Sequence, residues 1–114
     1  MTDGEKTQRA KDFLSSYALY KQWLDASRHD RGSMDGEAVM DDIFLQAKLF
    51  AVREFVFSLP NCRENLFLNC HYIRLYTVEK SAEMMGISVR SAYRLKTRAI
   101  AFAAEHIKEE NFQK

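Results

Sequence analysis

One expected helix near the C-terminus carries cationic and hydrogen-bonding side chains on a single face. At about 100° per residue, this face comprises Arg90, Arg94 and Thr97, with Tyr93 and Arg98 at its edges. An arginine can bind the O6 and N7 atoms of a guanine in the major groove of duplex DNA, so we expect Arg90 and Arg94 to read guanine edges. The side chains placed for backbone phosphates are Ser91, Tyr93, Lys96 and Arg98.

The chain on either side of Gly86 predicts the elements that would present this face: a helix, a tight turn and a second helix. Thr77 can cap the first helix through its hydroxyl. Gly86 can end that helix in the left-handed conformation, and Ile87 fills the bend. Ser88 is the next N-cap candidate, so the second helix begins at about Val89. This order of elements is that of a helix-turn-helix DNA-binding unit.

The opposite sides of both helices are apolar and mostly small, as packing against a scaffold requires. We expect the first helix to bury Val78, Ser81, Ala82 and Met85, and the second to bury Ala92, Leu95 and Ala99, with Phe102 and Ala103 at the flanks. Arginines on an amphipathic helix are also typical of an ordinary solvated surface helix. The capped turn and the spacing of the small residues favour the helix-turn-helix over that alternative.

The second half of the chain resembles a known family of DNA-binding domains. The similar stretch covers about residues 58–107 and contains "LP" at 59–60, "YI" at 72–73, a threonine at 77, "GIS" at 86–88 and "RAI" at 98–100. These motifs resemble region 4, the C-terminal DNA-binding domain of bacterial sigma-70 factors. They are more similar still to the small phage transcriptional regulators of the ArpU/RinA-like type. The resemblance implies a sigma-region-4-like helix-turn-helix and double-stranded DNA as the partner.

In sigma region 4, the early positions of the last helix read the −35 promoter element. By resemblance, these positions fall on Val89, Arg90, Ser91, Tyr93 and Arg94. Val89, Ser91 and Tyr93 replace polar residues of sigma factors, so we do not expect the −35 consensus as the target. The complete expected DNA-binding set is Ser88, Val89, Arg90, Ser91, Tyr93, Arg94, Lys96, Thr97 and Arg98.

The composition favours a small all-α helical bundle. The 114 residues include one proline and four glycines. No apolar run reaches about 18 residues, and the N-terminus lacks an apolar signal core, so we expect no membrane span and a cytoplasmic protein. The net charge of +1 is uneven, because residues 1–60 hold 8 Lys/Arg and 10 Asp/Glu whereas residues 61–114 hold 9 and 6. A positive field confined to the second half suits a specific DNA binder.

The residues that could support catalysis or bind a metal do not form a recognisable site. Cys62 and Cys70 lie eight positions apart with His71 adjacent, which is not a zinc spacing, so we expect free thiols that are at least partly buried. We expect His71 and His106 to be structural, and His29 lies in a linker. The sequence contains no Gly-rich phosphate loop and no nucleophile elbow. We therefore expect neither enzymatic activity nor a cofactor.

The first half predicts two helices joined by a polar linker at about residues 27–37. The first helix spans about residues 6–27, and its apolar face comprises Phe13, Leu14, Tyr17, Ala18, Tyr20, Trp23 and Leu24. This face must pack against the second helix, which is the default, or against another copy of the chain. The second helix spans about residues 36–58, and its apolar surface extends more than half-way round: Val39, Ile43, Phe44, Ala47, Phe50, Ala51 and Phe55. Such a helix is central, or it is shared between subunits.

Leu59 and Pro60 end the second helix, because proline disfavours helix in the residue before it. A scaffold helix is expected over about residues 62–75, with Asn61 and Glu64 as a capping pair. Its inward residues are expected to be Leu66, Asn69 or Cys70, and Ile73. The last helix is expected to run to about Glu110 before the polar tail.

We therefore expect two regions: residues 1–58, a helical region with a role in dimerisation, and residues 59–114, the helix-turn-helix region. The expected function is sequence-specific binding of double-stranded DNA by a homodimeric transcriptional regulator of phage or mobile-element origin. RNA polymerase is a further candidate partner. Two alternatives stay open. One is a phage protein that uses this fold to inhibit a host protein, and the other is a ring-forming DNA-packaging adaptor of the small-terminase type.

Overall fold

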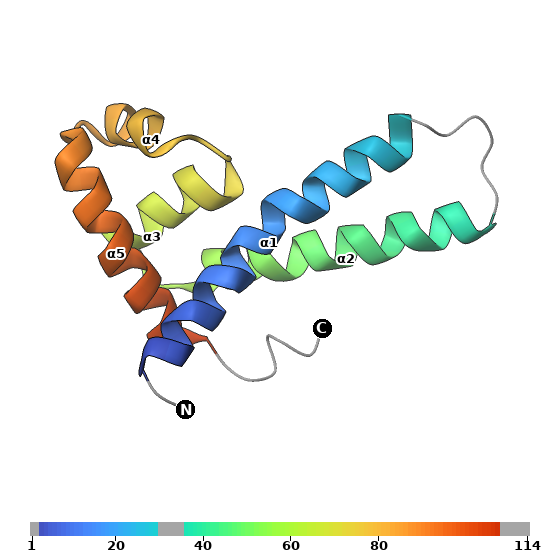
Figure 1. The fold of residues 1–114 in the computed structure, drawn as a ribbon, viewed down its shortest axis with the longest axis horizontal. Helices are drawn as coiled ribbons and strands as arrows, with labels where there is room; N and C mark the ends of the chain where they lie inside the picture. Colours follow the sequence, from blue (N-terminus) through green and yellow to red (C-terminus); the bar gives the residue numbers. More distant parts are fainter. Residues whose placement is uncertain (1–2, 30–35, 108–114) are drawn as a thin grey trace.

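The computed structural model describes residues 3–29 and 36–107, and within them it contains helices only (Figure 1). In chain order the elements are α1 (Asp3–His29), α2 (Gly36–Ser58), α3 (Arg63–Leu68), the π-helical turn η1 (Asn69–Ile73), α4 (Val78–Met85) and α5 (Val89–His106). The all-α fold class is thereby confirmed for these residues. Two expected bounds are corrected: α1 includes His29, which was expected in the linker, and α5 ends at His106, because Ile107 is extended, rather than at about Glu110. The expectations for the side chain of Val39, for residues 30–35 and for the chain after Ile107 lie outside the described residues.

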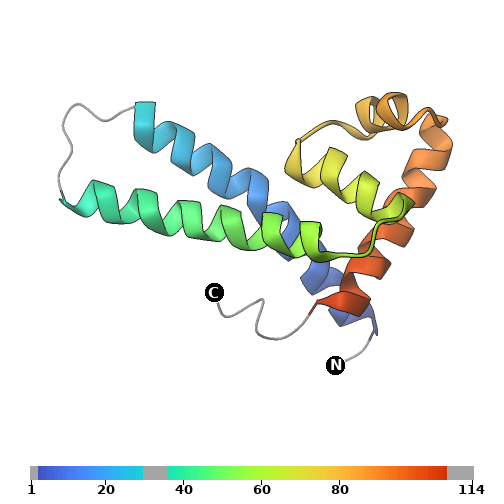
Figure 2. The same ribbon diagram turned by 180° about the vertical axis from the view of Figure 1, so that it is seen from behind.

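The helices α1 and α2 lie side by side and run antiparallel, forming an arm that projects from a group of shorter helices (Figures 1 and 2). The Cα trace extends over 47 × 34 × 21 Å. The N-terminal part of α1 crosses the base of the shorter helices and packs against α5 as well as against α2. In consequence α1 connects the arm directly to the last helix. None of the described helices combines the length and the apolar character that crossing a bilayer requires.

The main core draws residues from both halves of the sequence. One cluster of buried side chains joins Leu14 of α1 and Val56 of α2 to Phe67 of α3 and Leu95 of α5. A second cluster lies within the arm and comprises Tyr17, Leu24, Leu45, Leu49 and Val52. Residues before position 58 therefore help to bury the inner side of α5.

The bounds expected for α2 are confirmed at Gly36–Ser58, but most of its expected apolar surface is not buried within the described residues, so α2 is not a central helix there. Among the described side chains of α2, those that are buried are Leu45, Leu49, Val52, Phe55 and Val56, of which only Phe55 belongs to the expected apolar surface. Ile43, Phe44 and Phe50 are more than half exposed, and Ala47 is exposed as well. Both sides of α2 are apolar, and the Leu/Val side is the one that meets α1.

The central residues of the apolar face expected for α1 are buried, but the residues at its edges are exposed. Leu14, Tyr17 and Leu24 are buried, and Phe13 and Tyr20 are half-buried. Trp23 is 52% exposed and Ala18 is also exposed, because contact with α2 and α5 covers only a narrow seam. The seam continues instead to Ala10, which is fully buried.

The scaffold helix differs from the expected continuous helix over 62–75. It begins at Arg63, and neither Asn61 nor the N-cap residue Cys62 provides a side-chain cap. It passes at Asn69 into η1, in which the Arg74 amide donates to the Asn69 carbonyl at 2.9 Å. Leu66 is exposed, which corrects the expected inward face, while Cys70 is buried and Ile73 half-buried as expected. The side chains that fill the core here are Phe67, Leu68 and Tyr72.

Candidate nucleic-acid interface

The turn between α4 and α5 is closed by the side chains that the sequence indicated. The Thr77 hydroxyl accepts a hydrogen bond from the Lys80 amide at 3.0 Å, which caps α4. Gly86 ends α4 at φ +68°, in the left-handed region that glycine adopts without steric cost. The Ser88 hydroxyl accepts from the Ser91 amide at 3.1 Å and caps α5. These local bonds fix the direction in which α5 leaves the turn.

The inner sides of α4 and α5 are buried as expected. Ala92, Leu95, Ala99 and Ala103 of α5 are at most 2% exposed, and Val78, Ser81 and Ala82 of α4 are also buried. Met85, Ile87 and Phe102 are half-buried at the margin of the same core. Because most of these side chains are small, α5 lies close to α3, α1 and α4 along its length. This packing holds α5 as a rigid element.

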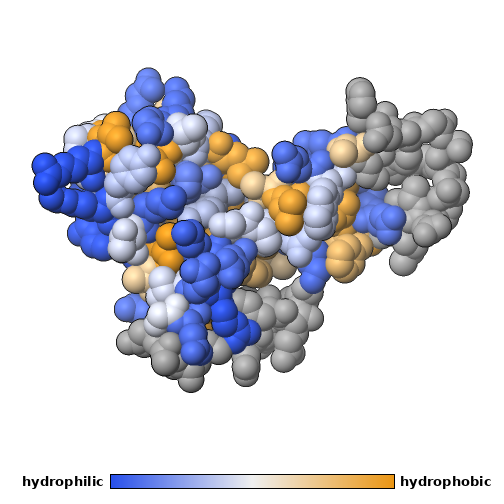
Figure 3. All heavy atoms as spheres, viewed as in Figure 1, coloured by the Kyte–Doolittle hydropathy of each residue, from blue (hydrophilic) through white to orange (hydrophobic). Residues whose placement is uncertain are grey.

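The outer side of α5 is open and cationic. Arg90, Arg94 and Arg98 are exposed, and none of them forms an ion pair with another described residue. Hydrophilic side chains gather along this edge of the molecule (Figure 3). Ser88, Val89, Ser91 and Thr97 are also exposed. Guanidinium groups in this state are free to bind an anion or a base edge without first breaking a bond within the protein.

Two of the expected contact residues are less free. Tyr93 is exposed, but its hydroxyl donates a hydrogen bond to Glu79 Oε1 of α4 at 3.0 Å. This bond raises the pKa of Tyr93 above its ordinary value, because the carboxylate favours the protonated phenol. Lys96 is half-buried, and its charge contributes to lowering the pKa of His71, after the larger effect of burial. Tyr93 therefore joins the two helices of the turn, and its hydroxyl proton is already engaged.

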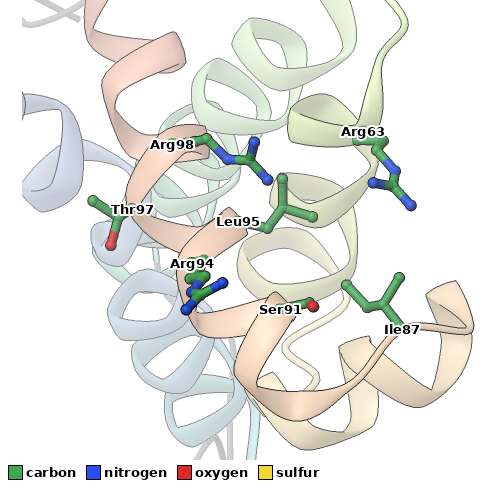
Figure 4. Close-up of a pocket in the computed structure, with 7 residues that line it drawn as sticks. All are labelled: Arg63, Ile87, Ser91, Arg94, Leu95, Thr97 and Arg98. Carbon is green, nitrogen blue, oxygen red and sulfur yellow. The ribbon is translucent and has the colours of Figure 1, made fainter.

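A concavity of about 620 Å³ lies beside the open side of α5 (Figure 4). Arg94 and Arg98 of α5 line it on one side, and Arg63 at the start of α3 lines it on the other. Leu95 lies between them, and Ile87 lines the hollow on the side of Arg63 (Figure 4). Three guanidinium groups from two helices thus converge on one open hollow. The positive charge of its lining suits an anion such as a phosphate group.

Arg63 was absent from the expected set, and a buried side chain explains how it is positioned. Asn65 donates from Nδ2 to the carbonyl oxygens of Leu59 and Pro60, at 2.9 and 3.1 Å. Its Oδ1 accepts from Asn69 at 2.7 Å. Asn65 thus ties the start of α3 to the end of α2. The one sequence signal for Arg63 was a basic residue just after the proline that ends α2.

The remaining polar groups have structural surroundings. His71 Nδ1 donates to the Tyr76 carbonyl oxygen at 2.7 Å, and burial above all lowers the pKa of this histidine. Burial raises the pKa of the Cys70 thiol. Cys62 is exposed, which corrects the expectation of partial burial, and both thiols are free. Among the described residues no three His, Cys, Asp or Glu side chains form a group that could hold a metal ion.

Comparison with known proteins adds no relative to this picture. No protein-family model matches the chain, and neither the curated proteins nor the solved structures contain a significant match to it.

Proposed function

We propose that this protein is a sequence-specific, double-stranded DNA-binding transcriptional regulator that places the N-terminal half of α5 in the major groove. One observation carries the proposal: the exposed side of α5 holds Arg90, Arg94 and Arg98 without ion pairs to other described residues, while its opposite side is buried in the core. Because the inner side of the helix is packed, the backbone that carries these guanidinium groups needs no ordering on binding. The resemblance to sigma region 4 supports the same function, and it supports a phage or mobile-element origin.

The proposal assigns different tasks to different side chains. Arg90 and Arg94 lie nearest the start of α5, the part of a recognition helix that contacts base edges. Arg98 and Arg63 lie beside the adjacent hollow and contact phosphates, which position the protein without reading the sequence. Tyr93 keeps α4 and α5 together through Glu79 and contacts the duplex only as an acceptor.

Selection of bound sequences from random duplexes, at a stated salt concentration, tests this proposal directly. On the selected site, Arg90→Ala and Arg94→Ala should each weaken binding by about 1–3 kcal/mol and relax the preference at one base pair. Arg53→Ala is a matched control, because Arg53 is an exposed arginine on α2, a helix that the proposal does not place on the DNA. Unchanged binding by the double variant Arg90→Ala/Arg94→Ala would contradict the assignment of α5.

A second candidate function is inhibition of a host protein by a protein–protein contact. The observation that favours it is the exposed apolar side of α2, which contains Ile43, Phe44 and Phe50. Such an inhibitor would retain its activity in the double variant Arg90→Ala/Arg94→Ala, whereas a DNA-binding regulator would lose it. The same variant therefore separates the two functions.

A further inference from the structure

One side of α2 is apolar and has no partner among the described residues. Ile43, Phe44, Phe50 and Phe57 are 56, 56, 55 and 58% exposed. With Ala47, Ala51 and Glu54 they form a continuous stripe at helical spacing, which we call the outer face of α2. Folded monomers rarely expose a contiguous apolar patch of more than a few hundred Å², and larger patches mark interaction sites.

The outer face of α2 is shaped to receive a bulky side chain. A groove of about 340 Å³ runs along it, lined by Ala47 and Ala51 and bounded by Phe44 and Phe50. The alanines leave space at the centre, and the phenylalanines project beside it. A surface that has both a hollow and a phenylalanine ring beside it can be self-complementary, because the ring of each copy can enter the hollow of the other.

The charged side chains of the groove also favour a second copy of the chain. Lys48 and Glu54 both line it, and each lies three positions from Ala51. In an antiparallel pair of α2 helices with a two-fold axis at Ala51, Lys48 lies opposite the partner's Glu54, and the contact occurs twice. A parallel pair in the same register would instead bring Lys48 towards the partner's Lys48. Charge complementarity therefore selects the antiparallel arrangement.

The same axis brings the aromatic side chains together. Phe44 lies seven positions before Ala51, and Phe57 lies six positions after it. In the antiparallel pair, Phe44 of one copy therefore lies close to Phe57 of the other copy. Phe50 packs beside the partner's Ala51, where the small side chain leaves room. An aromatic residue exposes about 200 Å² when it is free. At little more than half exposed, the four large side chains of each copy can thus bury roughly 400 Å² of accessible surface. With the alanines and the aliphatic stems, the surface buried by both copies together reaches the ~1,000 Å² of a specific interface.

We propose that two copies of this protein form an isologous dimer through the outer faces of α2, antiparallel about a two-fold axis at Ala51. The dimer does not depend on DNA binding, because it uses α2 of the arm, whereas the proposed DNA contact uses α5 in the group of shorter helices (Figures 1 and 2).

Sedimentation velocity and light scattering on the full chain test the dimer. We expect a species of twice the 13.3 kDa chain mass, which dissociates on dilution. Phe50→Asp should give a monomer at all concentrations measured, since it places a carboxylate at the centre of the interface. Leu19→Asp is the matched control, because it adds the same charge at an exposed apolar position of α1 and should leave the dimer intact. A monomeric wild-type protein at every soluble concentration, a larger ring, or a dimer that survives Phe50→Asp would each overturn the proposal.

Charge exchange tests the register without removing apolar surface. Lys48→Glu and Glu54→Lys each create two like-charge contacts, so each should raise the dimer dissociation constant about 10-fold. The double variant Lys48→Glu/Glu54→Lys restores both opposite-charge contacts and should dimerise within about threefold of wild type. A mixture of the two single variants should form heterodimers for the same reason. Failure of the double variant to recover would overturn the antiparallel arrangement, and circular dichroism would check that each variant is folded.

Discussion

The hollow between α3 and α5 makes a quantitative prediction about Arg63. In this structure Arg63, Arg94 and Arg98 line one open concavity, and none of them is paired with a described carboxylate. If Arg63 neutralises one phosphate, the Arg63→Ala variant neutralises one phosphate fewer and releases correspondingly fewer counterions from the DNA when it binds. The slope of log K against log salt should then become less steep by about 0.9. This corresponds to about fivefold weaker binding at 0.15 M salt and about 15-fold at 0.05 M.

Fluorescence anisotropy titrations over a range of salt concentrations measure this slope on both a selected and a scrambled duplex. The loss should be equal on the two duplexes, because a phosphate contact carries no sequence information. Arg90→Ala should instead weaken binding to the selected duplex more than to the scrambled one. Arg53→Ala, at an exposed position of α2, should change neither the slope nor the affinity. An unchanged slope for Arg63→Ala would show that Arg63 neutralises no phosphate and would refute the reasoning. An unchanged slope for Arg98→Ala as well would show that the hollow, which both residues line, does not face the duplex.

Three further predictions concern the scaffold. Tyr93→Phe and Glu79→Gln should each lower the urea midpoint of unfolding, because the two side chains share one hydrogen bond. In a double-mutant cycle their effects should therefore be less than additive. Additive effects would mean that the bond does not form in solution. Ser81→Ala should raise the free energy of unfolding by about 1 kcal/mol, since the buried Ser81 hydroxyl has no hydrogen-bond partner in the described structure, and a clear loss of stability would contradict this. Burial lowers the pKa of His71 in the folded protein below 6.5. The free energy of unfolding should therefore be largest above pH 6.5 and fall as the pH drops below that value. Urea titrations at a series of pH values measure this dependence, and His71→Gln should flatten it.

The capped turn could be predicted from sequence because its bonds are local. Thr77 bonds to an amide three positions later, and Ser88 does the same. Gly86 needs only its own backbone conformation to end α4. Each role depends on fewer than five consecutive residues, so a single sequence contains the information. The inner side of α5 was predictable for a similar reason, since its apolar residues recur at the helical period and the outer side is charged.

The buried face of α2 could not be predicted in this way, because both of its sides are apolar. Leu49 and Val52 are buried because they meet Tyr17 and Leu24 of α1. That choice depends on a contact between residues about 30 positions apart, and periodicity within α2 does not encode it. Phe50, on the opposite side, is as hydrophobic as the residues that were buried. Of the two alternatives for α2, the central helix does not hold, and the surface left exposed is the one that we propose as an interface between subunits.

Asn65 and Arg63 escaped prediction for a different reason. Asn65 bonds to carbonyl groups five and six positions earlier, across the end of one helix and the start of the next. Neither the helical period nor a capping pattern describes such a bond. Arg63 owes its place beside α5 to this tie and to the packing of α3 on α5. Its role became visible only when the two helices were placed together.

The two proposals are mechanically linked through α1, and the link constrains the DNA site. The 27 residues of α1 span about 40 Å, and the helix packs on α2 in the arm and on α5 at its base. A dimer fixed at the outer faces of α2 would therefore fix the separation and the two-fold relation of the two α5 helices as well. The expected operator is an inverted repeat with one preferred spacing near a whole number of DNA turns, each ~34 Å. Duplexes with the same half-sites at a series of spacings would measure this preference. A flat response to spacing, together with a confirmed dimer, would show that the arm moves relative to α5.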